Sequence, residues 1–292
     1  MSNLQIRRAL WASASLSIDE FLCRATPHRH GEEEVSGAHS VVFVRSGAFL
    51  RTIEGESLLA DPTRVLFFAR GQPYRVTHPI AGGDRCTIVT ARADTLLEIG
   101  RHHDPRWFED PDAPFAARQG LATARAALLH QVVLSGLRGG AVDPLATHEL
   151  ILELLDEVLR RTVPTPGCGR GAPRVTARAR ELAEVTRIAL SERYAAPPSL
   201  EELARTLGCS PFHLCRTFKR VVGLPLRRYR DRLRLRLALD RLGAGEPCLT
   251  ALALDLGYAD HSHFTNAFRR EFGRPPSALR PSTSRDGSGR RA

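Results

Sequence analysis

The sequence predicts an α+β multidomain protein, with an N-terminal β-barrel, a helical segment and a C-terminal all-α domain containing two helix-turn-helix units. Three observations support this prediction. Short runs rich in Val, Ile, Phe and Thr alternate with turn signals over residues 18–92. Two helical patterns follow over residues 114–161. A pattern of roughly fifty residues then occurs twice in the basic C-terminal part.

The totals indicate an ordinary globular protein. A length of 292 residues, with 42% hydrophobic and 25% charged residues, suggests two or three cores. No apolar run approaches the ~18 residues that a membrane span needs, and residues 1–18 lack the apolar stretch of a secretory signal. Six widely spaced cysteines do not indicate a disulfide framework. We therefore expect a cytoplasmic protein without membrane contact.

The net charge of +10 is confined to one part of the chain. Residues 1–173 carry 19 Arg and 20 acidic residues, whereas residues 174–292 carry 22 Arg, Lys219 and 12 acidic residues. A basic domain beside a neutral one suggests a polyanionic partner for the basic domain. A merely solvated basic surface is the alternative.

The predicted strands lie at the spacing of a sandwich or small barrel. The clearest runs are Ser40–Val44, Ala48–Ile53, Arg64–Phe68 and Cys86–Thr90. Helices are expected over Pro114–Leu137 and Pro144–Arg161, and the second carries an apolar stripe: Leu145, Leu150, Leu154, Leu155, Val158 and Leu159. The stripe is either a core-packing face or the seam of a homodimer.

Residues 162–174 contain three Pro and three Gly and are predicted to be a linker. The expected organisation is a β-domain (1–100), a helical dimerisation segment (101–161), this linker, an all-α domain (175–281) and a disordered tail (282–292).

The two copies of the C-terminal repeat keep register except for one extra residue in the second turn. Leu203-Ala204, Gly208, Leu214, Phe218, Lys219-Arg220, Gly223 and Pro225 correspond to Leu252-Ala253, Gly257, Phe264, Phe268, Arg269-Arg270, Gly273 and Pro275. Two copies are too few for a solenoid, so they are duplicated supersecondary units.

Each copy has the pattern of helix, tight turn, helix. In the first, Ser199 and Glu202 form a capping box, Gly208 allows the turn, and Ser210 caps the next helix with Pro211 at its first position. The second helix has a polar, basic outer face, which is how a helix-turn-helix approaches a major groove.

In the second copy, Thr250 is expected to cap the first helix, Gly257 to turn the chain, and Asp260 to cap a helix from His261. Between the copies, Leu226–Leu242 has six Arg in its first eleven residues and no turn signal. We predict one helix there, joining the units and lying near phosphate.

Residues 181–281 resemble the DNA-binding domain of the AraC/XylS family of bacterial transcription regulators, most specifically in Gly257–Pro276. The resemblance implies that two recognition helices read successive major-groove segments. Carried over by position, the candidates for base contact are Phe212, Cys215, Arg216, His261, Ser262, His263, Thr265 and Asn266, and those for further DNA contact are Lys219, Arg220, Arg269 and Arg270. Cys215 departs from the family, which commonly has a stronger hydrogen-bonding residue there. Phe212 could instead belong to the core.

The β-rich half resembles the cupin-like effector domain that precedes many such DNA-binding domains, on strand order and on Gly47, Gly71 and His78. That resemblance implies a ligand-responsive barrel and a dimer, without naming the ligand. The implied partners of the whole chain are promoter DNA, RNA polymerase, a small-molecule effector and a second copy.

Two sets of residues in this half could bind a metal. His28, His30 and Glu34 match part of the cupin metal motif, but the flanking glycines are absent and Tyr74 occupies the usual place of a later histidine. The second set is Cys23, His39, His78 and Cys86, which could form a tetrahedral site for zinc or another transition metal. If Pro79–Arg85 closes a hairpin, His78 and Cys86 would face each other ~5 Å apart. Ordinary core packing is the alternative.

Three functional classes follow from these observations. The first is a ligand- or metal-responsive, DNA-binding transcription regulator, such as an activator, without enzymatic activity. The second is a cupin metalloenzyme fused to a DNA-binding module. The third is a DNA-repair methyl acceptor, which would need a cluster of four metal-bound cysteines that the sequence lacks.

Overall fold

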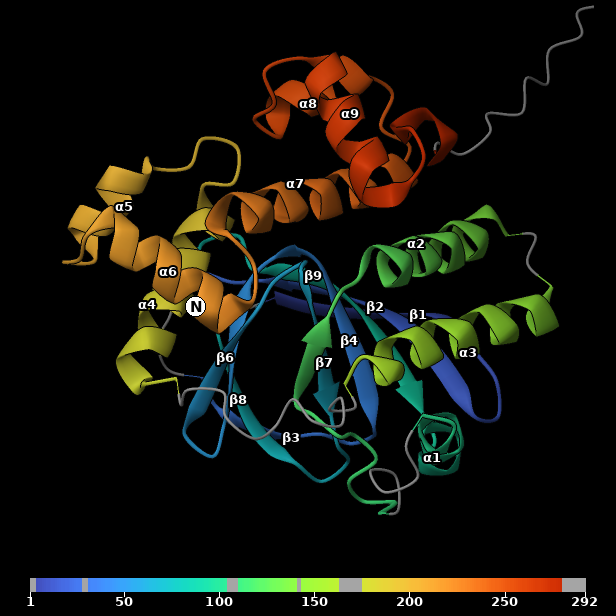
Figure 1. Ribbon diagram of the computed structural model, residues 1–292. Helices are drawn as coiled ribbons and strands as arrows, with labels where there is room; N and C mark the ends of the chain where they lie inside the picture. Colours follow the sequence, from blue (N-terminus) through green and yellow to red (C-terminus); the bar gives the residue numbers. More distant parts are fainter. Residues whose placement is uncertain (1–3, 28–30, 104–109, 141–142, 163–174, 280–292) are drawn as a thin grey trace, which may run out of the picture.

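The computed structural model describes residues 4–27, 31–103, 110–140, 143–162 and 175–279 (Figure 1). Two β-sheets and their covering helices form the N-terminal half, and helices form the C-terminal half. Most of the predicted linker (163–174) and the whole predicted tail (282–292) lie outside the described residues. None of the described helices is long and apolar enough to cross a membrane.

The strands form two antiparallel sheets. The six-stranded sheet has the order β1 (Leu4–Ala12), β2 (Leu16–Arg24), β9 (Asp84–Ala91), β4 (Ser40–Gly47), β7 (Arg64–Phe68) and β10 (Gln119–Leu121). The four-stranded sheet has the order β3 (Glu33–Val35), β8 (Pro73–Thr77), β5 (Phe49–Ile53) and β6 (Glu56–Ala60). Among the described strands, no ladder joins the two sheets, so the predicted barrel is not closed by hydrogen bonds.

Both faces of the six-stranded sheet are buried at its centre, around β4. In β4, Val41 and Phe43 face a core formed with α2 (Ala124–Gly139) and α3 (Pro144–Arg160), whereas Val42 and Val44 face the four-stranded sheet. This double burial explains why four consecutive residues of β4, Val41–Val44, are apolar instead of alternating with polar ones. The helices lie across one face of the sheet, with α1 (Ala93–Arg101) at one end (Figure 1).

The apolar stripe on α3 belongs to this core. Ile151, Leu154, Leu155 and Leu159 are fully buried, whereas Leu145 at the start of the helix is exposed. Within one chain, most of the stripe is therefore a core-packing face. The other predicted helix begins only at Ala124, because residues 119–121 pair with β7 as β10.

Pro79–Arg85 does not close the hairpin on which the expected contact between His78 and Cys86 depended. β8 pairs with β3 and β5, whereas β9 pairs with β2 and β4, so this connection crosses from one sheet to the other. Gly83 makes the crossing possible, because its φ is +76° and a Cβ there would lie 2.0 Å from the carbonyl oxygen of Cys23.

The C-terminal half contains the predicted pair of helix-turn-helix units. Its helices are α4 (Ala177–Glu192), α5 (Leu200–Thr206), α6 (Pro211–Val222), α7 (Leu226–Gly243), α8 (Leu249–Asp255), α9 (His261–Phe272) and the 3₁₀ helix η2 (Pro276–Leu279). The capping box of Ser199 and Glu202 is present, and Ser210 and Asp260 cap α6 and α9. The N-cap of α8 is Cys248 and not the predicted Thr250.

The two halves are in contact through α4 and α7. Arg45 of β4 forms an ion pair with Asp240 of α7 at 2.5 Å, and Arg236 of α7 donates to the carbonyl oxygen of Ala122 at 2.9 Å. α7 lies between the sheet with α2 on one side and α8 and α9 on the other (Figure 1). The all-α domain is therefore seated on the β-domain.

Candidate nucleic-acid interface and cavity

The second helices of the two units, α6 and α9, have the same pattern of exposure. Leu214 and Phe218 of α6 are fully buried, as are Phe264 and Phe268 at the equivalent positions of α9. These buried residues anchor each helix to its own small core, so the opposite face of each helix is presented to solvent.

The predicted DNA-contacting residues lie on these outer faces. The exposed ones are Phe212, Arg216, Lys219, Arg220, His261, Ser262, His263, Asn266, Arg269 and Arg270, and the half-buried ones are Cys215 and Thr265. Phe212 is 75% exposed, which removes the alternative that it belongs to the core. A phenyl ring so exposed at the start of a helix is available for contact with a partner.

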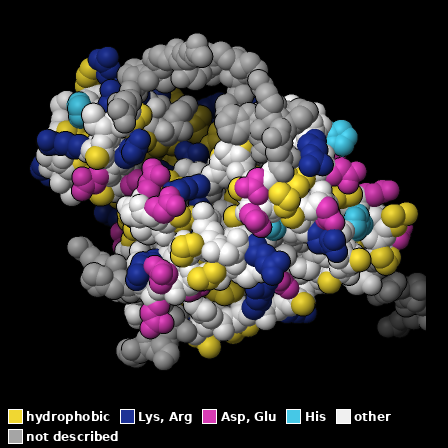
Figure 2. Space-filling view, turned by 90° about the horizontal axis from the view of Figure 1, so that it is seen from below, with side chains coloured by type: hydrophobic (Ala, Val, Ile, Leu, Met, Phe, Trp, Pro, Cys, Tyr) yellow, Lys and Arg dark blue, Asp and Glu magenta, His cyan; other side chains and the backbone are white. Residues whose placement is uncertain are grey.

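Basic residues gather at the ends of both helices. Lys219 and Arg220 occupy the last turn of α6, and Arg269 and Arg270 occupy the last turn of α9. Positive charges there also interact favourably with the negative end of the helix dipole. In the view of Figure 2, Lys and Arg side chains predominate at the left, over the α4–α6 module, whereas acidic and basic side chains alternate over the β-domain.

The joining helix α7 does not present all its arginines to solvent. Arg234 is buried and donates to the carbonyl oxygens of Tyr194 and Ala195 at 2.7 and 3.0 Å. Arg236 is buried and donates to Glu271 at 3.1 Å. These two arginines are structural, so the expectation that the Arg-rich start of α7 lies near phosphate fails for them.

A cavity of about 660 Å³ lies between the two sheets. Its apolar lining includes Phe21, Val42, Phe49, Phe68 and Ile88. Its polar lining includes Ser17, Ser40, Tyr74, Thr90 and a cluster of Cys23, His78, Asp84 and Cys86. Apolar walls with a few convergent polar groups are typical of small-molecule sites.

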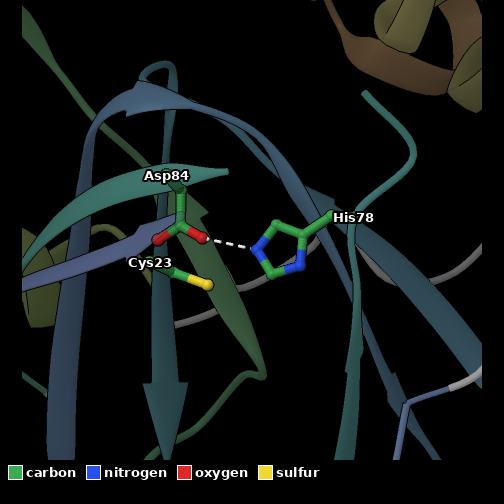
Figure 3. A group of neighbouring side chains, drawn as sticks. All are labelled: Cys23, His78 and Asp84. Atoms are coloured by element: carbon green, nitrogen blue, oxygen red, sulfur yellow. Dashed lines mark hydrogen bonds and ion pairs between the residues drawn. The ribbon is translucent and has the colours of Figure 1, made fainter. Parts of the chain in front are cut away.

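Three side chains of this polar cluster could share one ion. A potential ligand atom of each of Cys23, His78 and Asp84 lies within 4.8 Å of those of the other two, and all three residues are buried (Figure 3). His78 Nε2 lies 2.7 Å from Asp84 Oδ1, and the Cys86 thiol donates to Asp84 Oδ2 at 3.0 Å.

The structure thus brings Cys23 and His78 together with Asp84, places Cys86 beside Asp84, and separates His39 from this group. His39 lies at another surface hollow, where its Nδ1 accepts a hydrogen bond from the backbone N–H of Arg70 at 3.1 Å. Asp84 takes the place that His39 was expected to fill. Asp84 lies two residues before Cys86 and six after His78, and this spacing could have identified it as a ligand. It was not considered because a hairpin was assumed between His78 and Cys86.

Burial raises the pKa values of both thiols in the cluster. Burial raises the pKa of Cys23 to about 11, with a smaller contribution from the negative charges of Asp84 and Glu34. Burial, followed by Asp84, also raises the pKa of Cys86 well above its ordinary value. Both side chains are therefore neutral thiols at neutral pH without a cation beside them.

The partial cupin motif gives no second site within the described residues. His28 and His30 lie outside them, and the Glu34 carboxylate accepts a hydrogen bond from Tyr74 at 2.8 Å. Tyr74 is therefore the partner of Glu34.

Comparison with known proteins gives matches for the C-terminal region. A family model described as "Helix-turn-helix domain" matches residues 203–282. The HTH-type transcriptional activator RhaS of Escherichia fergusonii is 37% identical over 91 residues, which are 31% of this chain and 33% of RhaS. The regulatory protein SoxS of Salmonella typhimurium is 35% identical over 91 residues, which are 31% of this chain and 85% of SoxS.

Among solved structures, ToxT from Vibrio cholerae aligns over 90% of this chain and 97% of its own, at 11% identity and a TM-score of 0.33. The chain also spans only about a third of the length of RhaS.

The duplicated units, their shared exposure pattern and these matches define a helix-turn-helix regulator. The chain belongs to the AraC/XylS family of bacterial transcription regulators.

Proposed function

We propose that this protein is a sequence-specific DNA-binding transcription regulator that reads promoter DNA with α6 and α9. The observation that carries the proposal is the shared exposure pattern of these two helices, which leaves matching polar and basic faces on a duplicated scaffold. Two units that read one duplex explain why the repeat occurs twice.

Within this interface, the exposed residues divide into two roles. Arg216 of α6 and Asn266 of α9 occupy equivalent positions, and both side chains can form paired hydrogen bonds with base edges. Lys219 and Arg269, one turn further along, are suited to hold phosphate and fix the register. Phe212 and Cys215 would add apolar contacts, for example with a thymine methyl group.

The N-terminal half is proposed to be a cupin-like sensor domain, with its effector bound in the cavity of about 660 Å³ between the sheets. Sites for small molecules commonly have volumes of about 300–1,000 Å³. The β-domain contacts α4 and α7 directly, so a change in the cavity has a physical route to the DNA-binding units.

Further parts of the proposal rest on the family. RhaS is named an activator, and we propose that this chain also activates transcription in the cytoplasm, as a homodimer that contacts RNA polymerase and without catalytic activity of its own. With the stripe of α3 buried, the dimer interface would have to lie elsewhere.

The test is selection of bound sequences from random DNA duplexes by the full-length protein. We expect one enriched motif with two blocks about one helical turn apart, and an affinity that falls steeply with salt. Equal binding to selected and scrambled duplexes, or no binding at low salt, would overturn the proposal.

A further inference from the structure

The polar cluster in the cavity ties together segments that are far apart in the sequence. Cys23 lies on β2, His78 lies just after β8, and Asp84 and Cys86 lie on β9. Strand pairing places Cys23 opposite Asp84 and Phe21 opposite Cys86. Figure 3 shows the Cys23 sulfur and the His78 ring lying on the same side of the Asp84 carboxylate.

This cluster gathers four potential metal ligands in a buried, mostly apolar setting. Cys23, His78, Asp84 and Cys86 are each at most 5% exposed, and all line a cavity with apolar walls. Burying an ionisable imidazole, a carboxylate and two thiols together is costly unless they serve each other or a ligand. Thiolate, imidazole and carboxylate are the donors that zinc prefers in proteins.

We propose that Cys23, His78, Asp84 and Cys86 bind one zinc ion or a similar divalent ion that accepts thiolates, with Cys86 as the fourth ligand. The ion would replace the two thiol protons, which pass to solvent, and the neutral His78 ring would bind it through Nε2 while carrying its one proton on Nδ1. Two thiolates and one carboxylate against a divalent cation leave one negative charge on the site.

Binding would need small rearrangements of the side chains. For bonds of about 2.0–2.3 Å, the ligand atoms of a tetrahedral zinc site are roughly 3.5 Å apart. A ligand atom of each of Cys23, His78 and Asp84 lies within 4.8 Å of those of the other two, and the Cys86 side chain, outside this group, would turn towards the ion. The metal would bond the His78 segment to the β2–β9 pair and so join the two sheets, which the described strand ladders leave unconnected.

A short path leads from this site to the DNA-binding units. Cys86 pairs with Val44 of β4, and Arg45, the next residue, lies at a bulge and forms its ion pair with Asp240 of α7. The metal would lie on one face of the sheet and α7 on the other. The inference therefore has a second part, which rests on the proposed function: metal binding at this site changes the affinity of the protein for DNA.

The test of metal binding uses the reduced, metal-free full-length protein titrated with Co²⁺ and with Zn²⁺. We expect one ion per chain, sulfur-to-cobalt charge-transfer absorption, and a melting temperature that rises with zinc. Cys86→Ser and the isosteric Asp84→Asn should weaken zinc binding about tenfold or more. In the matched control, Cys248→Ser replaces an exposed thiol with a residue that also caps α8, and should leave binding unchanged.

Two outcomes would overturn the inference. The first is that the wild-type protein shows no thiolate-to-cobalt absorption and is not stabilised by zinc. The second is that Cys248→Ser loses as much zinc binding as Cys86→Ser. If Cys86→Ser does not fold, Cys23→Ser replaces it with the same expectations.

DNA binding measured on the same samples separates this inference from the proposed function. Specific DNA binding by protein that binds no metal contradicts the inference alone. Metal binding at Cys86 by protein that binds no DNA supports the site and contradicts the proposed function. An affinity for the selected DNA that is identical with and without zinc would remove the coupling to α7.

Discussion

The hydroxyl group of Tyr229, in the helix that joins the two helix-turn-helix units, donates to a carboxylate oxygen of Asp61 in the β-domain at 2.7 Å. Arg187 of α4 donates to the same oxygen. All three side chains are at most 1% exposed. Burial opposes ionisation of Asp61, but Arg187 and the hydrogen bonds from Thr63 and Tyr229 outweigh it and lower its pKa. A buried ion pair thus fastens the first DNA-binding unit to the β-domain.

Asp61→Asn is expected to destabilise the full-length protein by about 3–5 kcal/mol, because it leaves the buried Arg187 guanidinium without its main counter-charge. Tyr229→Phe, which removes one hydrogen bond to a charged group, should cost about 1.5–3 kcal/mol. Urea unfolding measures both. Asp94→Asn, which breaks an exposed ion pair with Arg92, is the control and should leave the unfolding midpoint unchanged. Equal midpoints for Asp61→Asn and the control would show that the buried pair does not hold the halves together.

His130 of α2 gives the protein a specific sensitivity to acid. Its ring stacks on Phe43 at 4.6 Å and is buried, and no described residue is a hydrogen-bond partner of its Nε2. Burial, and then the charges of Arg45 and Arg138, lower its pKa from 6.5 to about 3. Between these values the unfolded state binds one more proton than the folded state. Stability is therefore complete above about pH 6.5 and falls as the pH decreases towards 3, by up to ~1.4 kcal/mol per pH unit.

His130→Phe keeps an aromatic ring against Phe43 and removes the titration. We expect its unfolding free energy to fall less between pH 6.5 and 4.5 than that of the wild type, whatever its value at neutral pH. Exposed His102→Gln should follow the wild type. Parallel curves for wild type and His130→Phe would mean that His130 is protonated in the folded protein in this range.

Patterns that act within one element could be predicted from the sequence. Three helix caps form as expected: the capping box of Ser199 and Glu202, the cap at Ser210 and the cap at Asp260. They could be predicted because a cap depends on only a few neighbouring residues. The helix over 226–242 was predicted from composition alone, and it differs from α7 by one residue.

Features that depend on pairing between distant segments could not be predicted. The observed cluster contains Asp84 in place of the predicted His39. The chain crosses between the sheets after His78 instead of forming a hairpin, and sequence patterns did not indicate this crossing. The packing of α7 likewise buries Arg236 against the β-domain and Arg234 against the segment after α4, although a helical wheel alone would leave both solvated.

The two proposed roles at the DNA interface predict different losses. Arg216→Ala should weaken binding to the selected motif by about 1–3 kcal/mol and relax the preference at one base position. Lys219→Ala should weaken binding to selected and scrambled duplexes equally and reduce the salt slope by about one. Fluorescence anisotropy over a salt series measures both. If the two variants lose affinity alike on scrambled DNA, the division between base reading and phosphate contact is wrong.

The two turn glycines, equivalent in the repeat, should differ in their tolerance of a side chain. Gly208 has a φ of +62° and open space around a built Cβ, so Gly208→Ala should cost only the strain of the left-handed backbone, about 1–2 kcal/mol. Gly257 has a φ of +79°, and its Cβ would lie 2.0 Å from the carbonyl oxygen of Ala195 and 2.6 Å from Arg234 Nη2. Gly257→Ala must therefore also displace backbone or break the hydrogen bond from Arg234 to Ala195.

We expect Gly257→Ala to be the less stable of the two variants by urea unfolding, and to lose more affinity for the selected DNA at a temperature where both remain folded. The reason is that the turn at Gly257 sets the angle between α8 and the recognition helix α9, whereas Gly208 can accept a methyl group without moving α6. Each variant is compared with wild type in the same buffer, so the pair controls for the shared cost of positive φ. Equal stability and equal affinity would mean that the contact between Gly257 and Ala195 does not position the second unit.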